Sequence, residues 1–184
     1  MMSRADDTLL EALREKAALV VAGSLTSGAR EHRPPASCDA VVSAETALGF
    51  ALDPFLRRAY LEVCDGGIGP GYGSLPVTGE ESLSSVYASF RGGAWPPGLL
   101  PVWDWGDAAW SCVDLSGRIV THDDVAGATV TDFTTRSWLS AWIDGVDLWT
   151  ELYDDKEATI LNPFTRKPVV TKVRGVAKGR PWPG

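Results

Sequence analysis

The sequence is poor in the residues that build most metal and thiol sites. Its 184 residues include only two histidines and three cysteines. Cys38, Cys64 and Cys112 are odd in number, and their spacing suits neither a zinc site nor a disulfide framework. Free thiols of this kind are typical of a reducing compartment. The sequence therefore predicts a cytoplasmic protein.

Long hydrophobic runs are also missing. The longest apolar run near the start, residues 17–22, is far shorter than the ~20 residues that cross a bilayer. The acids before it (Asp6, Asp7, Glu11 and Glu15) do not suit the basic beginning of a signal peptide. We therefore expect neither a membrane span nor export by a signal peptide.

Basic residues are outnumbered, with 17 Lys and Arg against 24 Asp and Glu, for a net charge of −7. This balance argues against nucleic acid as a partner, because nucleic-acid binders usually carry a basic patch. The charge is also uneven: residues 104–155 hold eleven acids and two bases, whereas residues 156–184 hold seven bases and one acid. The acidic stretch is either a solvated face that the tail partly neutralises or a docking surface for a basic partner.

The sequence also lacks any assembled catalytic motif. The glycine-rich stretch 66–73 has neither the spacing of a dinucleotide fingerprint nor the Gly-Lys-Ser/Thr ending of a phosphate loop. A Cys–His pair formed by Cys112 and His122, or a metal held by His122 with nearby aspartates, is chemically possible but matches no known motif. A small hydrolase or metal enzyme that uses His122 is therefore kept only as a third hypothesis.

What the sequence does contain is a series of segments with clear periodicity. Apolar spacing predicts helices over residues 3–22, 40–64, 82–90 and 135–153, with a restart at Asp53-Pro54 and a weak point at Gly145. Alternation predicts strands over residues 99–103, 109–115, 118–122 and 128–133, with a hairpin turn at Ser116-Gly117. Two further β-like runs cover residues 159–161 and 169–173, and residues 174–184 are expected to be mobile.

The order of these elements lacks βαβ alternation and so predicts an α+β fold, a single mostly antiparallel or mixed sheet packed against helices. We divide the chain into an accessory N-terminal helix and linker (1–39), a main domain (40–153) and a basic C-terminal extension (154–184).

Four blocks in this order resemble the SUKH superfamily, which includes the Smi/Knr regulators of fungal cell-wall synthesis. They are the helix motif of residues 44–60 that runs into Asp65-Gly66-Gly67, the Leu-Leu-Pro and Asp-Trp-Gly block within residues 95–106, the hairpin of residues 110–122, and the closing helix of residues 137–145. Two departures are the insertion of Asp53 before Pro54 and the replacement of an Asn by Asp65. The match covers about residues 40–153.

The resemblance implies a SUKH-like α+β domain that acts by binding a protein and uses no cofactor. Many bacterial members resemble immunity proteins that neutralise polymorphic toxins, so the expected partner is a cognate toxin domain, bound by a monomer or a homodimer. Together with the acidic stretch, this predicts a contact set of Asp104, Trp105, Asp107, Trp110, Asp123 and Asp124. Burial in the core is the competing interpretation for the two tryptophans. The alternative function is a cellular scaffold or regulatory adaptor of the same fold.

Overall fold

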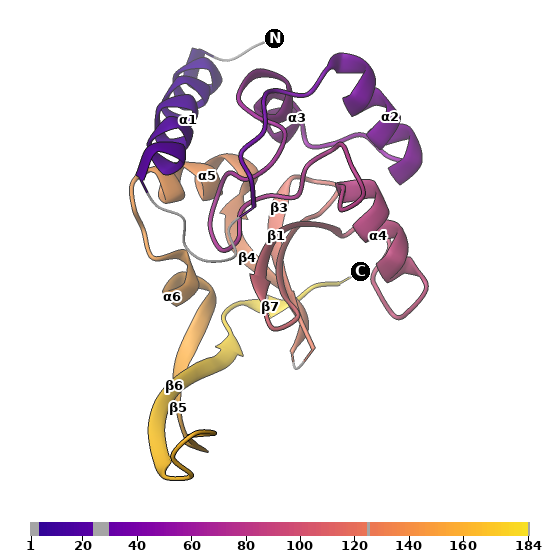
Figure 1. Cartoon of the computed structure of the whole chain (residues 1–184). Coiled ribbons are helices and arrows are strands. Elements are labelled where there is room, and N and C mark those ends of the chain that lie inside the picture. The colour runs from indigo at the N-terminus through magenta and orange to yellow at the C-terminus, as the bar shows by residue number, and fades with distance from the viewer. Residues whose placement is uncertain (1–3, 24–29, 125, 184) are drawn as a thin grey trace.

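A five-stranded sheet lies at the centre of the molecule (Figure 1). The computed structural model describes residues 4–23, 30–124 and 126–183. The strand order is β1-β2-β3-β4-β7, and every neighbouring pair is antiparallel. The strands are β1 (Leu100–Gly106), β2 (Ala109–Val113), β3 (Arg118–Asp123), β4 (Gly127–Thr134) and β7 (Arg180–Pro181). The α+β class and the antiparallel sheet packed against helices are confirmed.

The helices begin where short polar side chains can accept hydrogen bonds from free backbone N–H groups. Ser37, Asp53, Ser82, Thr134 and Asp147 cap α2, α3, α4, α5 and α6 in this way. The helices are α1 (Arg4–Gly23), α2 (Cys38–Leu48), α3 (Pro54–Glu62), α4 (Leu83–Arg91), α5 (Thr135–Ile143) and α6 (Leu148–Leu152). The predicted restart at Asp53-Pro54 is confirmed, because Asp53 caps α3 and Pro54 is its first residue.

The two faces of the sheet are covered differently, and strand alternation decides which residue lies on which face. Leu100, Trp103, Val113 and Ile119 belong to the main core, which the helices complete; we call this side the helix-covered face. Cys112, Val120 and Val130 form a smaller cluster with Leu99, against which Trp95 and Trp182 pack. We call this second side the tryptophan-covered face.

A two-stranded antiparallel sheet extends away from this body (Figure 1). It consists of β5 (Tyr153–Leu161) and β6 (Pro168–Ala177), and we call residues 153–177 the arm. Its root is anchored, because Tyr153 and Ala177 are buried in the main core. The predicted β-like runs at 159–161 and 169–173 lie in these two strands.

The N-terminal helix packs on the same core as the rest of the chain. Leu10, Leu13 and Ala17 of α1 are buried there. Asp6 pairs with Arg136 of α5 at 2.6 Å, and Asp7 pairs with Arg58 of α3 at 2.8 Å. Ser3, the expected first residue of this helix, lies outside the described residues. None of the described helices is both long and apolar enough to cross a membrane.

Two predictions about the C-terminal half are wrong. Residues 135–153 do not form one helix: Gly145 adopts φ = +78°, a left-handed conformation that divides the segment into α5 and α6. The tail expected to be mobile, residues 174–184, instead contains paired strands in its described part: β6 continues to Ala177, and β7 pairs with β4. The backbone N–H of Trp182 also donates to the carbonyl of Ala128 at 2.9 Å.

Candidate binding surface

The predicted contact residues gather at one end of the sheet. Asp104 lies opposite Trp110, and Trp110 lies opposite His122, so these three occupy one row across β1, β2 and β3. Asp107 lies in the β1–β2 turn, while Asp123 and Asp124 lie where β3 leads into the β3–β4 turn. Because successive strands are antiparallel, both turns are at the same end.

Two of the acidic residues hold the local structure together. Asp104 accepts a hydrogen bond from Arg30 on one carboxylate oxygen, at 2.9 Å, and from the backbone N–H of Gly106 on the other, at 2.8 Å. Asp123 is buried, and its carboxylate accepts from the backbone N–H of Ala126 at 2.7 Å. These carboxylates fix the two turns, and Asp123 offers almost no surface to a partner.

Trp105 packs on the helix-covered face and is itself only partly exposed. Its ring lies between those of Trp138 and Trp149, with centroids 6.4 and 5.4 Å away. Its indole N–H donates to the hydroxyl of Ser111 at 2.8 Å. For this tryptophan the structure favours the core interpretation.

Asp107 and Asp124 are exposed, and Trp110 is partly exposed. The β1–β2 turn is held in a type I′ conformation, since Asp107 and Ala108 both have positive φ, +47° and +58°. This turn places Asp107 beyond the ends of the strands, at the same end of the sheet as Asp124.

Beside these acids lies an aromatic cluster of which only Trp110 belongs to the predicted contact set. It consists of Phe90, Trp95, Trp110 and His122, all partly exposed. The ring of Trp95 stacks on His122 with centroids 4.1 Å apart and on Phe90 at 4.5 Å, and Phe90 meets Trp110 edge-on at 5.5 Å. Trp95 is fixed by its indole N–H, which donates to the carbonyl of Leu99 at 2.7 Å.

His122 is held toward its neutral form in this cluster. Partial burial lowers its pKa below the ordinary value of 6.5, and the nearby charge of Asp123 opposes that shift in part. A neutral imidazole stacked on an indole extends the apolar surface at pH 7. The aromatic cluster and the two exposed acids therefore form a compact surface of rings with carboxylates beside them.

The structure gives little support to thiol chemistry with His122. Cys112 lies opposite Val120 rather than His122, and burial raises the pKa of its thiol well above the usual range. Burial likewise raises the pKa of Cys64 to about 12. Such thiols stay protonated at neutral pH and are weak nucleophiles. Among residues 4–23, 30–124 and 126–183, no group of three His, Cys, Asp or Glu side chains could hold a metal ion.

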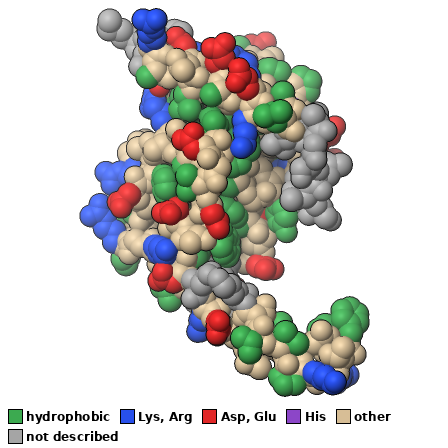
Figure 2. Space-filling view, turned by 90° about the vertical axis from the view of Figure 1, so that its left-hand side faces the viewer, with side chains coloured by type: hydrophobic (Ala, Val, Ile, Leu, Met, Phe, Trp, Pro, Cys, Tyr) green, Lys and Arg blue, Asp and Glu red, His purple; other side chains and the backbone are tan. Residues whose placement is uncertain are grey.

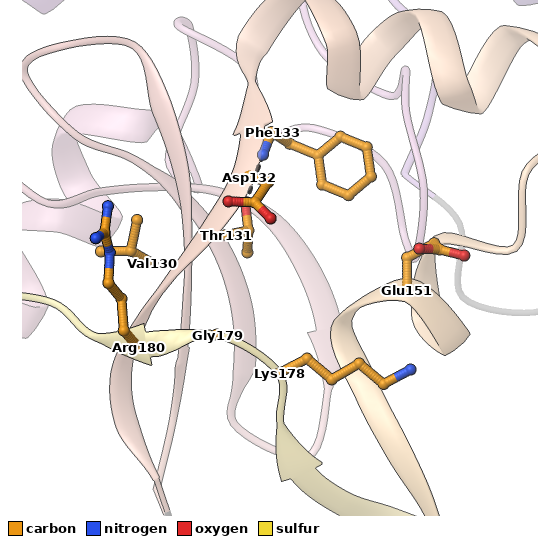
Figure 3. A pocket seen from close by; sticks show the side chains of 8 residues that line it. All are labelled: Val130, Thr131, Asp132, Phe133, Glu151, Lys178, Gly179 and Arg180. Atoms are coloured by element: carbon orange, nitrogen blue, oxygen red, sulfur yellow. Dashed lines mark hydrogen bonds between the residues drawn. The ribbon is translucent and has the colours of Figure 1, made fainter.

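A separate cleft of about 480 Å³ lies at the root of the arm (Figure 3). Asp132 and Phe133 of β4, Glu151 of α6, Lys178 and Arg180 are among its lining residues. Lys178 is engaged with its own chain, because its ammonium donates to the carbonyl of Thr150 at 2.7 Å. The cleft presents charges of both signs.

A scan of protein-family models finds no match to this chain, and a search of the curated proteins finds none either. The SUKH resemblance therefore stays a prediction from sequence motifs.

Proposed function

We propose that this chain is a non-enzymatic protein-binding module of the immunity type, which binds a basic surface of a toxin domain. The observation that carries the proposal is the aromatic cluster of Phe90, Trp95, Trp110 and His122, next to the exposed carboxylates of Asp107 and Asp124. The SUKH resemblance supplies the toxin as the partner class.

The two parts of this surface have different physical roles in binding. Tryptophan supplies a large rigid contact area, and such residues dominate the binding energy of protein interfaces. Exposed carboxylates at the margin attract a basic partner from a distance and mainly raise the association rate. Many toxin domains act on nucleic acids through basic clefts, so an acid-flanked aromatic surface can cover such a cleft and block its substrate.

This function requires no cofactor, since occlusion of the cleft is enough for inhibition. We also propose that it operates in a reducing compartment such as the cytoplasm, because Cys38, Cys64 and Cys112 are all free thiols.

The test uses the purified product of the adjacent gene as the candidate toxin. The paired change Asp107→Asn and Asp124→Asn removes two exposed charges with little change of shape. We expect it to slow association about tenfold at low salt, with a much smaller effect at high salt, because the loss is one of electrostatic steering. Stopped-flow fluorescence measures the association rate.

The matched control is Glu11→Gln with Glu15→Gln, which removes two exposed charges from α1. It should leave the association rate nearly unchanged. Equal effects of the two double variants would show that only net charge matters and would remove the surface assignment. A neighbouring product that is neither toxic nor bound, together with several host partners in a pull-down, would favour the scaffold function instead.

A further inference from the structure

The distal half of the arm exposes an unusual amount of apolar surface. Phe164 at the tip is 91% exposed, and Leu161 and Val170 are 66% and 64% exposed. Ile160 and Val169 are exposed as well. Figure 2 shows hydrophobic side chains at several places along the arm and basic side chains at its end. Exposed apolar side chains that gather on one element, rather than being scattered singly, mark a candidate interaction site.

The tip is an ordered loop. The side-chain carbonyl of Asn162 accepts hydrogen bonds from the backbone N–H groups of Phe164 and Thr165, at 2.9 and 3.0 Å. Two further backbone bonds of 2.9 Å close the loop, from Asn162 to Lys167 and from Arg166 to Asn162. Phe164 is therefore presented on a preformed loop, which lowers the entropy lost when it binds.

The described residues of the chain leave this surface exposed. Ile160 and Val169 are opposite each other on one face of the arm, while Leu161 and Val170 belong to the other face, so both faces are apolar. Within the described part of the chain, β5 and β6 pair only with each other. A two-stranded sheet in water is marginal by itself. Contact with another molecule would stabilise the distal arm.

The body of the same chain offers a surface of matching character. A groove of about 290 Å³ lies between residues 50–54 and the β2–β3 turn. Its apolar lining includes Leu52, Leu100 and Leu115, and Leu115 is 71% exposed. Two acids, Asp53 and Asp114, lie in the same lining. The groove is thus apolar and acidic, whereas the arm tip is apolar and basic, with Arg166 and Lys167 both exposed beside Phe164.

We propose that the arm tip of one copy of this chain docks into the groove of a second copy. Phe164 would occupy the apolar lining, and Arg166 and Lys167 would approach Asp53 and Asp114. The arm extends away from its own body, so a second copy of the chain is the molecule whose groove it would enter (Figure 1). The proposal is independent of the toxin-binding function, because the groove and the aromatic cluster are different surfaces.

Sedimentation velocity and light scattering on the purified full chain, over a series of micromolar concentrations, test this docking. We expect the wild type to self-associate. Phe164→Ser at the tip and Leu115→Ser at the groove should each weaken association at least about tenfold, as expected for the loss of one apolar anchor. Both side chains are strongly exposed, so neither change should affect folding, and circular dichroism checks this. Leu19→Ser on α1, at a residue 70% exposed, is the matched control and should associate as the wild type does.

Mixing the two defective variants gives the sharpest result. The Leu115→Ser protein keeps an intact tip and the Phe164→Ser protein keeps an intact groove. The mixture should therefore form a heterodimer at concentrations where each variant alone associates much more weakly. Contact between two tips would give no such complementation and would not respond to Leu115→Ser. A wild type that stays monomeric at the highest concentration overturns the proposal, as does association that Phe164→Ser leaves unchanged.

Discussion

The two faces of the central sheet come from the same strands, yet they are covered to different depths. On the helix-covered face, Trp103, Val113 and Ile119 are buried beneath the helices. On the tryptophan-covered face, Val120 and Val130 are shielded by Trp95 and Trp182, which remain partly exposed themselves. Alternate residues of one strand therefore serve a deep core on one side and an accessible aromatic surface on the other.

The two faces differ most near the β1–β2 and β3–β4 turns, where polar side chains are buried on one face and aromatic side chains are partly exposed on the other. Ser111, Thr121 and Thr129 are buried on the helix-covered face, with the hydroxyl of Thr121 donating to the carbonyl of Thr129 at 3.3 Å. In the adjacent row, Trp110 and His122 are partly exposed on the other face. Buried polar and exposed aromatic residues are the informative exceptions to ordinary burial. This inversion of the usual burial supports the proposal that the tryptophan-covered face is a binding surface.

The largest expected difference between the faces is in stability. Trp103→Ala should cost about 4 kcal/mol of unfolding free energy, because it empties a large, fully buried site. Trp182→Ala should cost only about 1–2 kcal/mol, because this side chain is partly exposed and covers a smaller cluster. Urea denaturation followed by circular dichroism measures both. Similar losses would mean that the two faces stabilise the fold equally.

A smaller effect separates two tryptophans of the helix-covered face that are equally buried. The indole N–H of Trp103 donates to the carbonyl of Ile68 at 3.0 Å, whereas that of Trp138 has no hydrogen-bond partner among the described residues. Trp103→Phe loses a hydrogen bond, while Trp138→Phe removes a buried polar group that is unpaired. We expect Trp103→Phe to be more destabilising by about 1–2 kcal/mol in the same urea assay. An equal cost would show that ring volume alone determines the packing.

The sequence predicted elements well where the signal is local. Asp53-Pro54 marks the start of α3 and Ser116-Gly117 marks the β2–β3 turn, because capping and turn formation depend on a few adjacent residues. It did not predict β7, whose partners in β4 are about fifty residues away. Pairing over such a distance is decided by tertiary packing, which local periodicity does not contain.

The candidate site was predictable only in part for the same reason. The charge pattern and the predicted strands were enough to predict acidic residues near the two turns. The burial of Asp123 and the ion pair of Asp104 with Arg30 depend on how the turns fold back and on a residue 74 positions away. The aromatic cluster joins α4, a loop and two strands, so its residues gave no shared signal in the sequence.

The smallest expected difference between the two faces is in how they make the stability of the fold depend on pH. His122 lies on the tryptophan-covered face, and partial burial lowers its pKa in the folded protein. The unfolded chain, with a histidine pKa near 6.5, therefore binds more protons as the solution becomes mildly acidic. The stability that depends on neutral His122 is complete above the unfolded pKa and is lost as pH falls through the lower folded pKa.

His122→Gln should flatten this loss of stability when urea unfolding is measured from about pH 7.5 down to about pH 5.5. His32, whose pKa burial also lowers, contributes a second part, so His32→Gln is the companion variant. The resolved carboxylate shifts, at Asp6, Glu62 and Asp147, are all downward and act below this window. Because the chain has no other histidine, the double variant should show almost no slope there. If His122→Gln leaves the dependence of stability on pH unchanged, the pH sensitivity arises outside the aromatic cluster. The two faces would then not differ in their response to pH.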